Sequence, residues 1–338
     1  MKRHLVYLIA VLAYYTGIVS VFYRLNRRTK RIITFHNVLP EGILPDGKKI
    51  GIVDTEIEFR HKIREICRRF KISNDFADSE TATITFDDGY LNQWETVGKI
   101  LNEEGKIPAV VFISGKLLGC DNSSGALVID KLMHWVELAP AGKYMLSGSA
   151  NRCFDLTDDN RREIWQNLIW KEFRKDSGRK GEQLLACLDE QYSMDEIFRQ
   201  CDKQYLRLRL TGINRQNIES MRQVGWQVGW HSYSHYPLSM LSMTDLQSEF
   251  ASAPEFTLQV PMSFPYGEME SVNHTVIDCC KKAGFPAAVS NLPDPTLLSG
   301  KYFLPRFTLD SNRYILHFEL SGFKYFLRSG HLLLDYEF

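Results

Sequence analysis

The chain has 338 residues, 41 basic and 41 acidic side chains, and 44% apolar residues. This apolar share supports a buried core and excludes an extensively disordered chain, while the even charge balance gives no sign of a nucleic-acid partner. The seven cysteines are an odd number without a CxxC pair, which indicates free thiols and not a disulfide framework.

Residues 5–23 form an uncharged and mostly apolar segment. One helix of this length would extend about 28 Å, close to the hydrocarbon thickness of a bilayer. The alternative is a cleaved signal peptide, whose apolar region is shorter and ends in small residues, whereas this segment ends in VFY. We therefore expect residues 1–24 to be a single-pass transmembrane anchor and residues 31–338 to form the folded domain.

Basic residues stand on both sides of the apolar segment. Lys2 and Arg3 precede it, and five basic residues follow it: Arg24, Arg27, Arg28, Lys30 and Arg31. By the positive-inside rule this asymmetry places the folded domain on the cytoplasmic side of the membrane. The free cysteines agree with a reducing compartment.

Beyond the anchor, short β-branched or aromatic runs alternate with helical patterns. The predicted strands are 31–35, 81–86, 109–113, 226–229, 260–264, 287–289 and 303–307. This alternation favours a parallel sheet or barrel wrapped by helices. Between residues 114 and 210 it gives way to helical patterns at 127–138, 161–173, 181–188 and 194–210, which is too long for a connection and indicates a helical insertion. Its tryptophans, Trp135, Trp165 and Trp170, are expected to pack inside the insertion, although such rings also stack on sugars.

Two adjacent carboxylates, Asp87 and Asp88, follow the predicted strand 81–86 in the segment TITFDDGY. Parallel α/β folds place their active sites at the carboxyl ends of strands. Neighbouring residues that leave a strand can point in different directions, so one carboxylate could bind a metal while the other faces a substrate. Because aspartate and glycine are also ordinary turn residues, the segment alone does not establish a site.

Two further segments follow predicted strands. In WHSYSH, His231 and His235 are four residues apart and could share a metal if the turn is helical or tightly looped; two unrelated surface histidines are the alternative. In FPYG, Pro265 and Gly267 bracket a rigid turn whose backbone amide could point into the same site. One aspartate and two histidines leave positions open on a divalent ion, as a catalytic metal site requires.

Together the three segments resemble the motifs of the polysaccharide deacetylases, the NodB-homology group of carbohydrate esterases. That family carries TFDDG, HSxxH and a proline–aromatic turn in this order, found here at 85–89, 231–235 and 264–267. The resemblance covers about residues 31–307 without the insertion, and it implies a distorted, incomplete (β/α) barrel of about seven strands. It also implies a hydrolase that removes N-acetyl groups from a polysaccharide, an oligosaccharide or a lipid-linked glycan.

The resemblance also assigns roles to residues. Asp87 becomes the general base, and Asp88, His231 and His235 become ligands of zinc or a similar divalent ion. The backbone amide of Tyr266 would hold the oxyanion, a role for which a preorganised amide is suited.

Other roles rest on weaker matches. Arg306, in the segment LPR, would orient the base, while His36 and Pro265 would line the cleft and contact the substrate. Two departures from the family are evident. Ser263 stands where many relatives have an arginine, and the nearest match to the histidine that serves as general acid is His317, in a segment that reads as helical and so favours a structural role.

Two other functions remain open from the sequence. A site of two histidines and one carboxylate is also typical of non-haem iron oxygenases, but Asp87 would have no task there and no HxD pair is present. A catalytically weak sugar-binding protein is suggested by the missing arginine and the unassigned acid. Relatives often act outside the cell, which opposes the cytoplasmic orientation expected from the basic residues.

Overall fold

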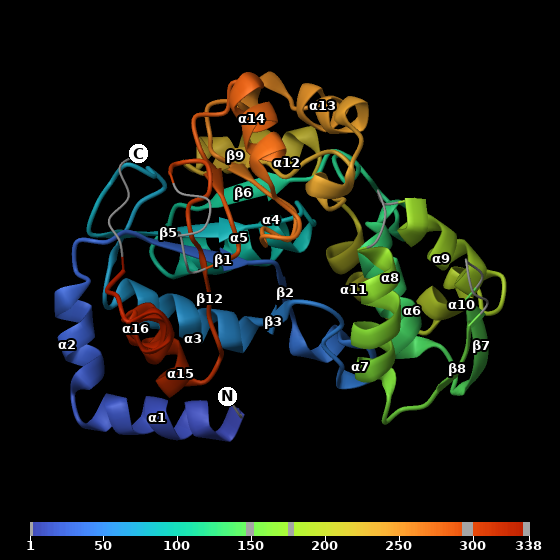
Figure 1. Ribbon diagram of the computed structural model, residues 1–338, viewed down its shortest axis with the longest axis horizontal. Helices are drawn as coiled ribbons and strands as arrows, with labels where there is room; N and C mark the ends of the chain where they lie inside the picture. Colours follow the sequence, from blue (N-terminus) through green and yellow to red (C-terminus); the bar gives the residue numbers. More distant parts are fainter. Residues whose placement is uncertain (1–2, 147–151, 175–178, 293–299, 334–338) are drawn as a thin grey trace.

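The computed structural model describes residues 3–146, 152–174, 179–292 and 300–333 (Figure 1). Its main sheet is parallel, with the strand order β12-β1-β5-β6-β9. The short strand β4 pairs with the first two residues of β5. The strands are β1 Arg31–Phe35, β4 Lys71–Ile72, β5 Thr81–Phe86, β6 Val110–Ile113, β9 Gln227–Trp230 and β12 Phe307–Thr308. Every residue of β1, β5 and β6 is buried, as expected for strands covered on both faces.

A second parallel pair consists of β10 Met262–Ser263 and β11 Ala288–Val289. An isolated parallel bridge joins Val289 to Leu304, three residues before β12, whereas the main sheet ends at β9. Six of the seven predicted strands therefore occur, several of them shortened, and the seventh, 303–307, shares only Phe307 with β12. The α/β class with a parallel sheet is confirmed, and the pairing is consistent with an incomplete barrel. A third parallel pair, β2 Asn37–Leu39 with β3 Val53–Thr55, was not predicted.

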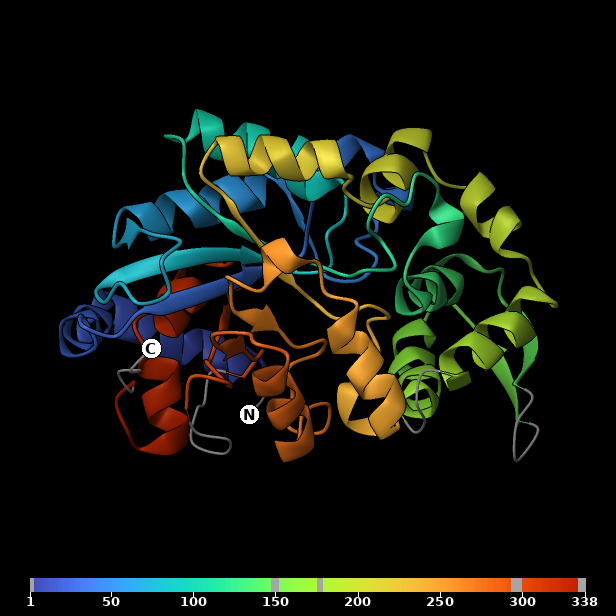
Figure 2. The ribbon, with the colours of Figure 1, turned by 90° about the horizontal axis from the view of Figure 1, so that it is seen from above.

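Helices surround this sheet (Figures 1 and 2). They are α3 Glu56–Cys67, α4 Asn92–Glu95, α5 Val97–Glu103, α12 Arg215–Gln223, α13 Met243–Ala251, α14 His274–Lys282, α15 Arg313–Leu320 and α16 Phe323–Ser329. Capping residues explain where the longest one begins: Thr55 and Glu58 form a capping box at α3. Its apolar face then packs on the strands, and Phe59 contacts Phe35 and Phe86 edge-on or tilted in the common core.

The predicted insertion is a separate lobe, on the right in Figure 1. It contains α6 Val128–Leu138, α7 Arg161–Ile164, the π-helical turn η4 Trp165–Ile169, α8 Trp170–Phe173, α9 Arg179–Asp189, α10 Met194–Arg199 and α11 Lys203–Leu210. Its hydrophobic cluster includes Leu132, Trp135 and Leu188 and extends to Leu39 of β2 and Val53 of β3. An antiparallel pair, β7 Gly142–Leu146 with β8 Arg152–Leu156, was not predicted.

Short 3₁₀ turns complete the described elements: η1 Glu41–Ile43, η2 Pro45–Gly47, η3 Ser123–Gly125, η5 Leu238–Met240 and η6 Glu255–Thr257. These turns lie between the strands and do not interrupt the sheet.

The amino-terminal region corrects the prediction of one straight transmembrane helix. The segment forms two helices, α1 Arg3–Tyr15 and α2 Ile18–Leu25, whose axes differ by 81°. The break lies at Gly17, whose φ of 80° is readily available only to glycine. Ala10 of α1 is buried against Phe318 of α15. Among the described helices none is by itself long and apolar enough to cross a membrane, whereas this bent pair meets the length and composition criteria jointly.

Candidate metal centre and catalytic cleft

The three sequence motifs lie together because each follows a strand that ends at the same edge of the parallel sheets. Asp87 and Asp88 follow β5, His231 follows β9, and the FPYG segment follows β10 directly. His235 lies in the loop after β9. Glu249 of α13 holds this loop, since its carboxylate accepts hydrogen bonds from the backbone amides of residues 233 and 234 at 2.7 and 2.9 Å.

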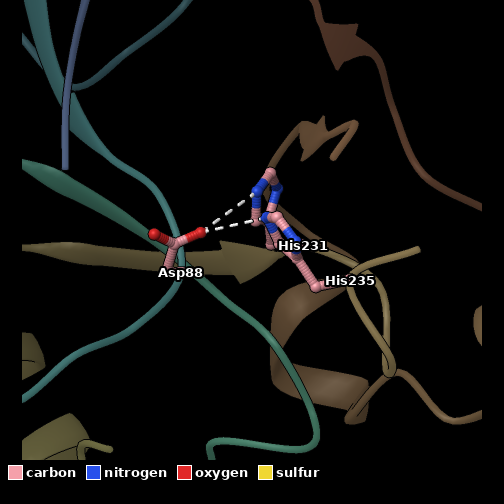
Figure 3. Close-up of side chains that lie close together, drawn as sticks. All are labelled: Asp88, His231 and His235. Carbon is pink, nitrogen blue, oxygen red and sulfur yellow. Dashed lines mark ion pairs between the residues drawn. The ribbon is translucent and has the colours of Figure 1, made fainter. Parts of the chain in front are cut away.

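Figure 3 shows Asp88 facing the two imidazole rings. Its Oδ1 atom lies 3.2 Å from His235 Nε2 and 3.7 Å from His231 Nε2. One ligand atom from each of the three residues lies within 4.8 Å of the others, and all three residues are buried. The structure thus brings together the three residues that the sequence predicts as metal ligands.

The chemistry of these donors fits a divalent cation. His231 donates from Nδ1 to the carbonyl oxygen of Ser263 at 2.7 Å, which leaves the Nε2 lone pair toward Asp88. Burial lowers the pKa of His231 to about 4, so the ring is neutral and able to ligate. Asp88 Oδ1 is buried and accepts no hydrogen bond within the described residues. A buried carboxylate oxygen without such a partner, facing two ring nitrogens, is a site that a cation would satisfy.

The pKa shifts of His235 and Asp88 also indicate that this group favours a positive charge. Burial disfavours the charged form of His235, but the negative charge of the adjacent Asp88 carboxylate outweighs burial and raises the pKa of His235. Burial likewise opposes ionisation of Asp88, yet the histidines hold the pKa of that carboxyl below its ordinary value. A proton and a metal ion therefore compete for the same place.

Asp87 forms a fully buried, bidentate ion pair with Arg306. The two nitrogen–oxygen distances are 2.7 and 2.5 Å, and Ser263 Oγ donates to the same carboxylate at 3.1 Å. Burial alone would raise the pKa of Asp87, but the Arg306 and His231 side chains lower it to about 2. Asp87 is consequently ionised at neutral pH. The predicted contact between Arg306 and Asp87 is present, and Ser263 is a second, neutral donor to the same carboxylate.

The turn at Tyr266 and Gly267 has a left-handed backbone, with φ values of 62° and 57°. A Cβ atom on Gly267 would lie 2.4 Å from the backbone nitrogen of Asn291, so this position requires glycine. Asn291 also donates from Nδ2 to the Tyr266 carbonyl at 3.0 Å. Within the described residues the Tyr266 amide donates no hydrogen bond, which leaves it available to an oxyanion. Pro265 is buried behind the turn.

A cavity of about 400 Å³ opens over this site. His36, Asp88, His231, His235 and Tyr266 line one part of it, and Trp165, Trp170 and Arg209 from the insertion line another. The predicted cleft residue His36 therefore faces the cavity, with Nε2 4.0 Å from Asp87 Oδ2, while Pro265 does not line it.

Four non-glycine residues of the site have positive φ angles: Asp88, Ser232, His235 and Tyr266. Such backbone conformations cost about 1–3 kcal/mol each and persist where the surroundings determine them. Gln93 provides part of this support, because it donates to the His36 carbonyl at 2.9 Å and to that of Asp87, and accepts from the Gly89 amide. Neither Gln93 nor Asn291 was predicted, since a single buried amide residue has no sequence signature.

His317 lies in α15, away from the cavity. Its two ring nitrogens contact Glu65 Oε2 at 3.1 Å and the Tyr23 hydroxyl at 3.0 Å. The structural interpretation of this histidine is therefore confirmed, and it does not occupy the position of a general acid.

No family model matches the sequence, and no curated protein matches it. Among solved structures, however, the fold is that of the polysaccharide deacetylases. The polysaccharide deacetylase BC0361 from Bacillus cereus has a TM-score of 0.50 and 10% identity, over 87% of this chain and 69% of that one. The deacetylase PplD from Streptococcus pyogenes, solved with acetate, has a TM-score of 0.48 and 12% identity, over 83% and 92% of the two chains. IcaB from Ammonifex degensii has a TM-score of 0.48 and 14% identity, over 87% and 96%. At these identities the likeness establishes the fold.

Proposed function

We propose that this chain is a metal-dependent hydrolase that removes N-acetyl groups from a glycan containing amino sugars, with zinc as the metal. The observation that carries the proposal is the buried group of Asp88, His231 and His235 beside the ionised Asp87. This arrangement stands at the strand ends of a fold shared with a solved polysaccharide deacetylase. Two histidines and one carboxylate form a donor set that zinc commonly takes in catalytic sites.

A divalent ion in this site would polarise the amide carbonyl and lower the pKa of an attacking water. Asp87 takes the proton of that water as oxygen adds to the carbonyl carbon. Arg306 holds the Asp87 carboxylate in place through both nitrogens. With a pKa of about 2, Asp87 is a weak base but gives the proton back readily. The amide of Tyr266 donates to the oxyanion, the carbon–nitrogen bond breaks, and acetate and a sugar amine leave.

Acetate release from defined glycans tests this function. The purified, zinc-loaded protein should release acetate from N-acetylglucosamine oligomers, a lipid-linked precursor or peptidoglycan fragments, and a chelator should abolish the release until zinc is restored. Metal binding without acetate from any of these substrates would favour a catalytically weak sugar-binding protein. Oxygen consumption without acetate would favour an oxygenase.

We also infer that α1 and α2 hold the protein at a membrane, with the catalytic domain on the cytoplasmic side. Each helix exposes a stripe of large apolar side chains, Leu5, Leu8, Leu12 and Tyr15 on α1 and Ile18, Val21 and Leu25 on α2. Arginines follow directly at 24, 27 and 28, where anionic headgroups would attract them. The full chain should sediment with membranes and a chain lacking residues 1–25 should not. Digestion of the domain by protease added outside intact cells would contradict the orientation.

A further inference from the structure

Two tryptophans of the insertion, Trp165 and Trp170, line the same cavity as the metal-ligand group. Both are only partly buried, whereas Trp135 is fully buried and donates from its indole to the Tyr192 carbonyl at 2.9 Å. The expectation that all three pack inside the insertion is correct for Trp135. Trp165 and Trp170 also pack against the hydrophobic cluster of the insertion, and Arg174 lies over the Trp170 ring at 5.1 Å. The part of each ring that lines the cavity remains open to a ligand.

The backbone explains why both rings reach the same wall. Residues five apart in an α-helix are separated by about 140° around the axis, so one of the two rings would face elsewhere. Here residues Trp165–Ile169 form a π-helical turn, in which hydrogen bonds join residues five apart and bring them nearly above one another. The ring centroids of Trp165 and Trp170 consequently lie 6.1 Å apart, with 28° between the ring planes.

This aromatic surface continues to the reaction centre. The Trp170 ring lies 5.3 Å from that of Tyr266, and the Tyr266 ring lies 4.9 Å from that of His235. The two positions are close enough for two linked units of one ligand, with one unit on the tryptophans and the next above the metal ligands. A pyranose ring fits such a surface, because its C–H face is apolar and packs against aromatic rings while its hydroxyls remain at the edge.

Arg209 supplies polar contacts in the same cavity. It is almost fully buried, and Nη2 pairs with Asp130 Oδ1. Nε and Nη1 have no hydrogen-bond partner among the described residues. The other carboxylate oxygen of Asp130 already accepts from the Tyr90 hydroxyl, so the pair offers free donors and no free acceptor. Ring or hydroxyl oxygens of a sugar would satisfy these donors.

We propose that Trp165, Trp170 and Arg209 form a second sugar subsite beside the deacetylation centre. The substrate is therefore a glycan of at least two linked sugar units, with one unit at the metal site and its neighbour on the tryptophans. This inference rests on the proposed function, which it extends from the type of reaction to the length of the substrate.

Replacement of Trp165 tests the subsite, because this side chain is only partly buried and lines the cavity. For a four-unit N-acetylglucosamine oligomer, Trp165→Ala should raise KM about tenfold with kcat unchanged, a loss typical of one aromatic contact. For the single sugar, KM should stay the same. Trp165→Phe should restore most of the affinity. Trp94→Ala is the matched control, since Trp94 lies on α4 at a different hollow.

A binding measurement separates this inference from the proposed reaction. Calorimetry with the deacetylated four-unit oligomer needs no turnover, and binding should weaken about tenfold in Trp165→Ala and not in Trp94→Ala. This result would support the subsite even if no acetate were released. Acetate release with equal KM for one and four units, unchanged in Trp165→Ala, would overturn the subsite and leave the reaction standing. Absence of any binding of the oligomer to the wild-type protein would also overturn it.

Discussion

Substitution of asparagine for Asp87 is expected to lower turnover by about 10²–10⁴-fold while the protein retains its metal. Asparagine has nearly the same size but cannot accept a proton at neutral pH. The metal should remain because Asp88, His231 and His235 supply the predicted ligands. Metal content and acetate release measured on one purified sample test both halves of this expectation. Lost metal would make Asp87 a ligand, and near-normal turnover would make it a turn residue.

This substitution should also destabilise the fold, because Arg306 would keep its buried charge without a carboxylate partner. Breaking a buried ion pair on one side typically costs about 3–5 kcal/mol. Unfolding by denaturant must therefore accompany the assay, so that turnover is expressed per folded molecule. Asp54→Asn is the matched control: Asp54 on β3 is ion-paired with Lys62 at 2.6 Å, outside the cavity. It should lose stability and keep its turnover.

Replacement of His235 by alanine should remove metal binding and activity together. Loss of a residue that only hydrogen-bonds to a metal ligand typically weakens metal affinity by about 10–100-fold. Loss of the ligand His235 itself should weaken it more. A bound metal stabilises the folded state, so added zinc should raise the Tm of the wild-type protein and not that of the variant. Full metal content together with normal turnover would exclude this site.

The matched control is His317→Gln, which changes another buried histidine. His317 lies between Glu65 and Tyr23 and not in the cavity. The variant should unfold more easily, bind zinc as the wild type does, and keep its kcat and KM once folded. A selective loss of kcat would mean that His317 acts in the reaction after all.

The strand-end residues could be predicted from sequence because a buried apolar strand and the polar residues of the site stand next to each other in the chain. A buried strand such as β5 must be apolar, so polar residues that follow it directly stand out, and Asp87 and Asp88 are of this kind. Parallel pairing then brings the ends of β5, β6 and β9 to one edge without further information. The strand ends therefore predict that these side chains lie close together, and the resemblance to the deacetylase motifs is what assigns Asp88, His231 and His235 as the metal ligands.

Other features depend on three-dimensional context that no local pattern contains. Gln93 and Asn291 act by satisfying backbone groups of distant loops, and buried amides of this kind look like surface residues in a sequence. Trp165 and Trp170 have the spacing of opposite faces of an α-helix, and only the π-helical turn places them together. The bend at Gly17 was missed because hydropathy records length and not direction.

The positive φ angles of Asp88, Ser232, His235 and Tyr266 have an implication for how this protein can be improved. Together their backbone conformations cost on the order of 4–12 kcal/mol, comparable with the 5–15 kcal/mol by which a typical domain is stable. The remainder of the fold must therefore provide enough stabilising free energy to offset this conformational cost. Substitutions that relax the backbone at these four positions should therefore raise thermal stability, but they should also reduce activity because they move the site residues. Helix caps, the exposed lobe surface and other places remote from the cleft are the safer targets.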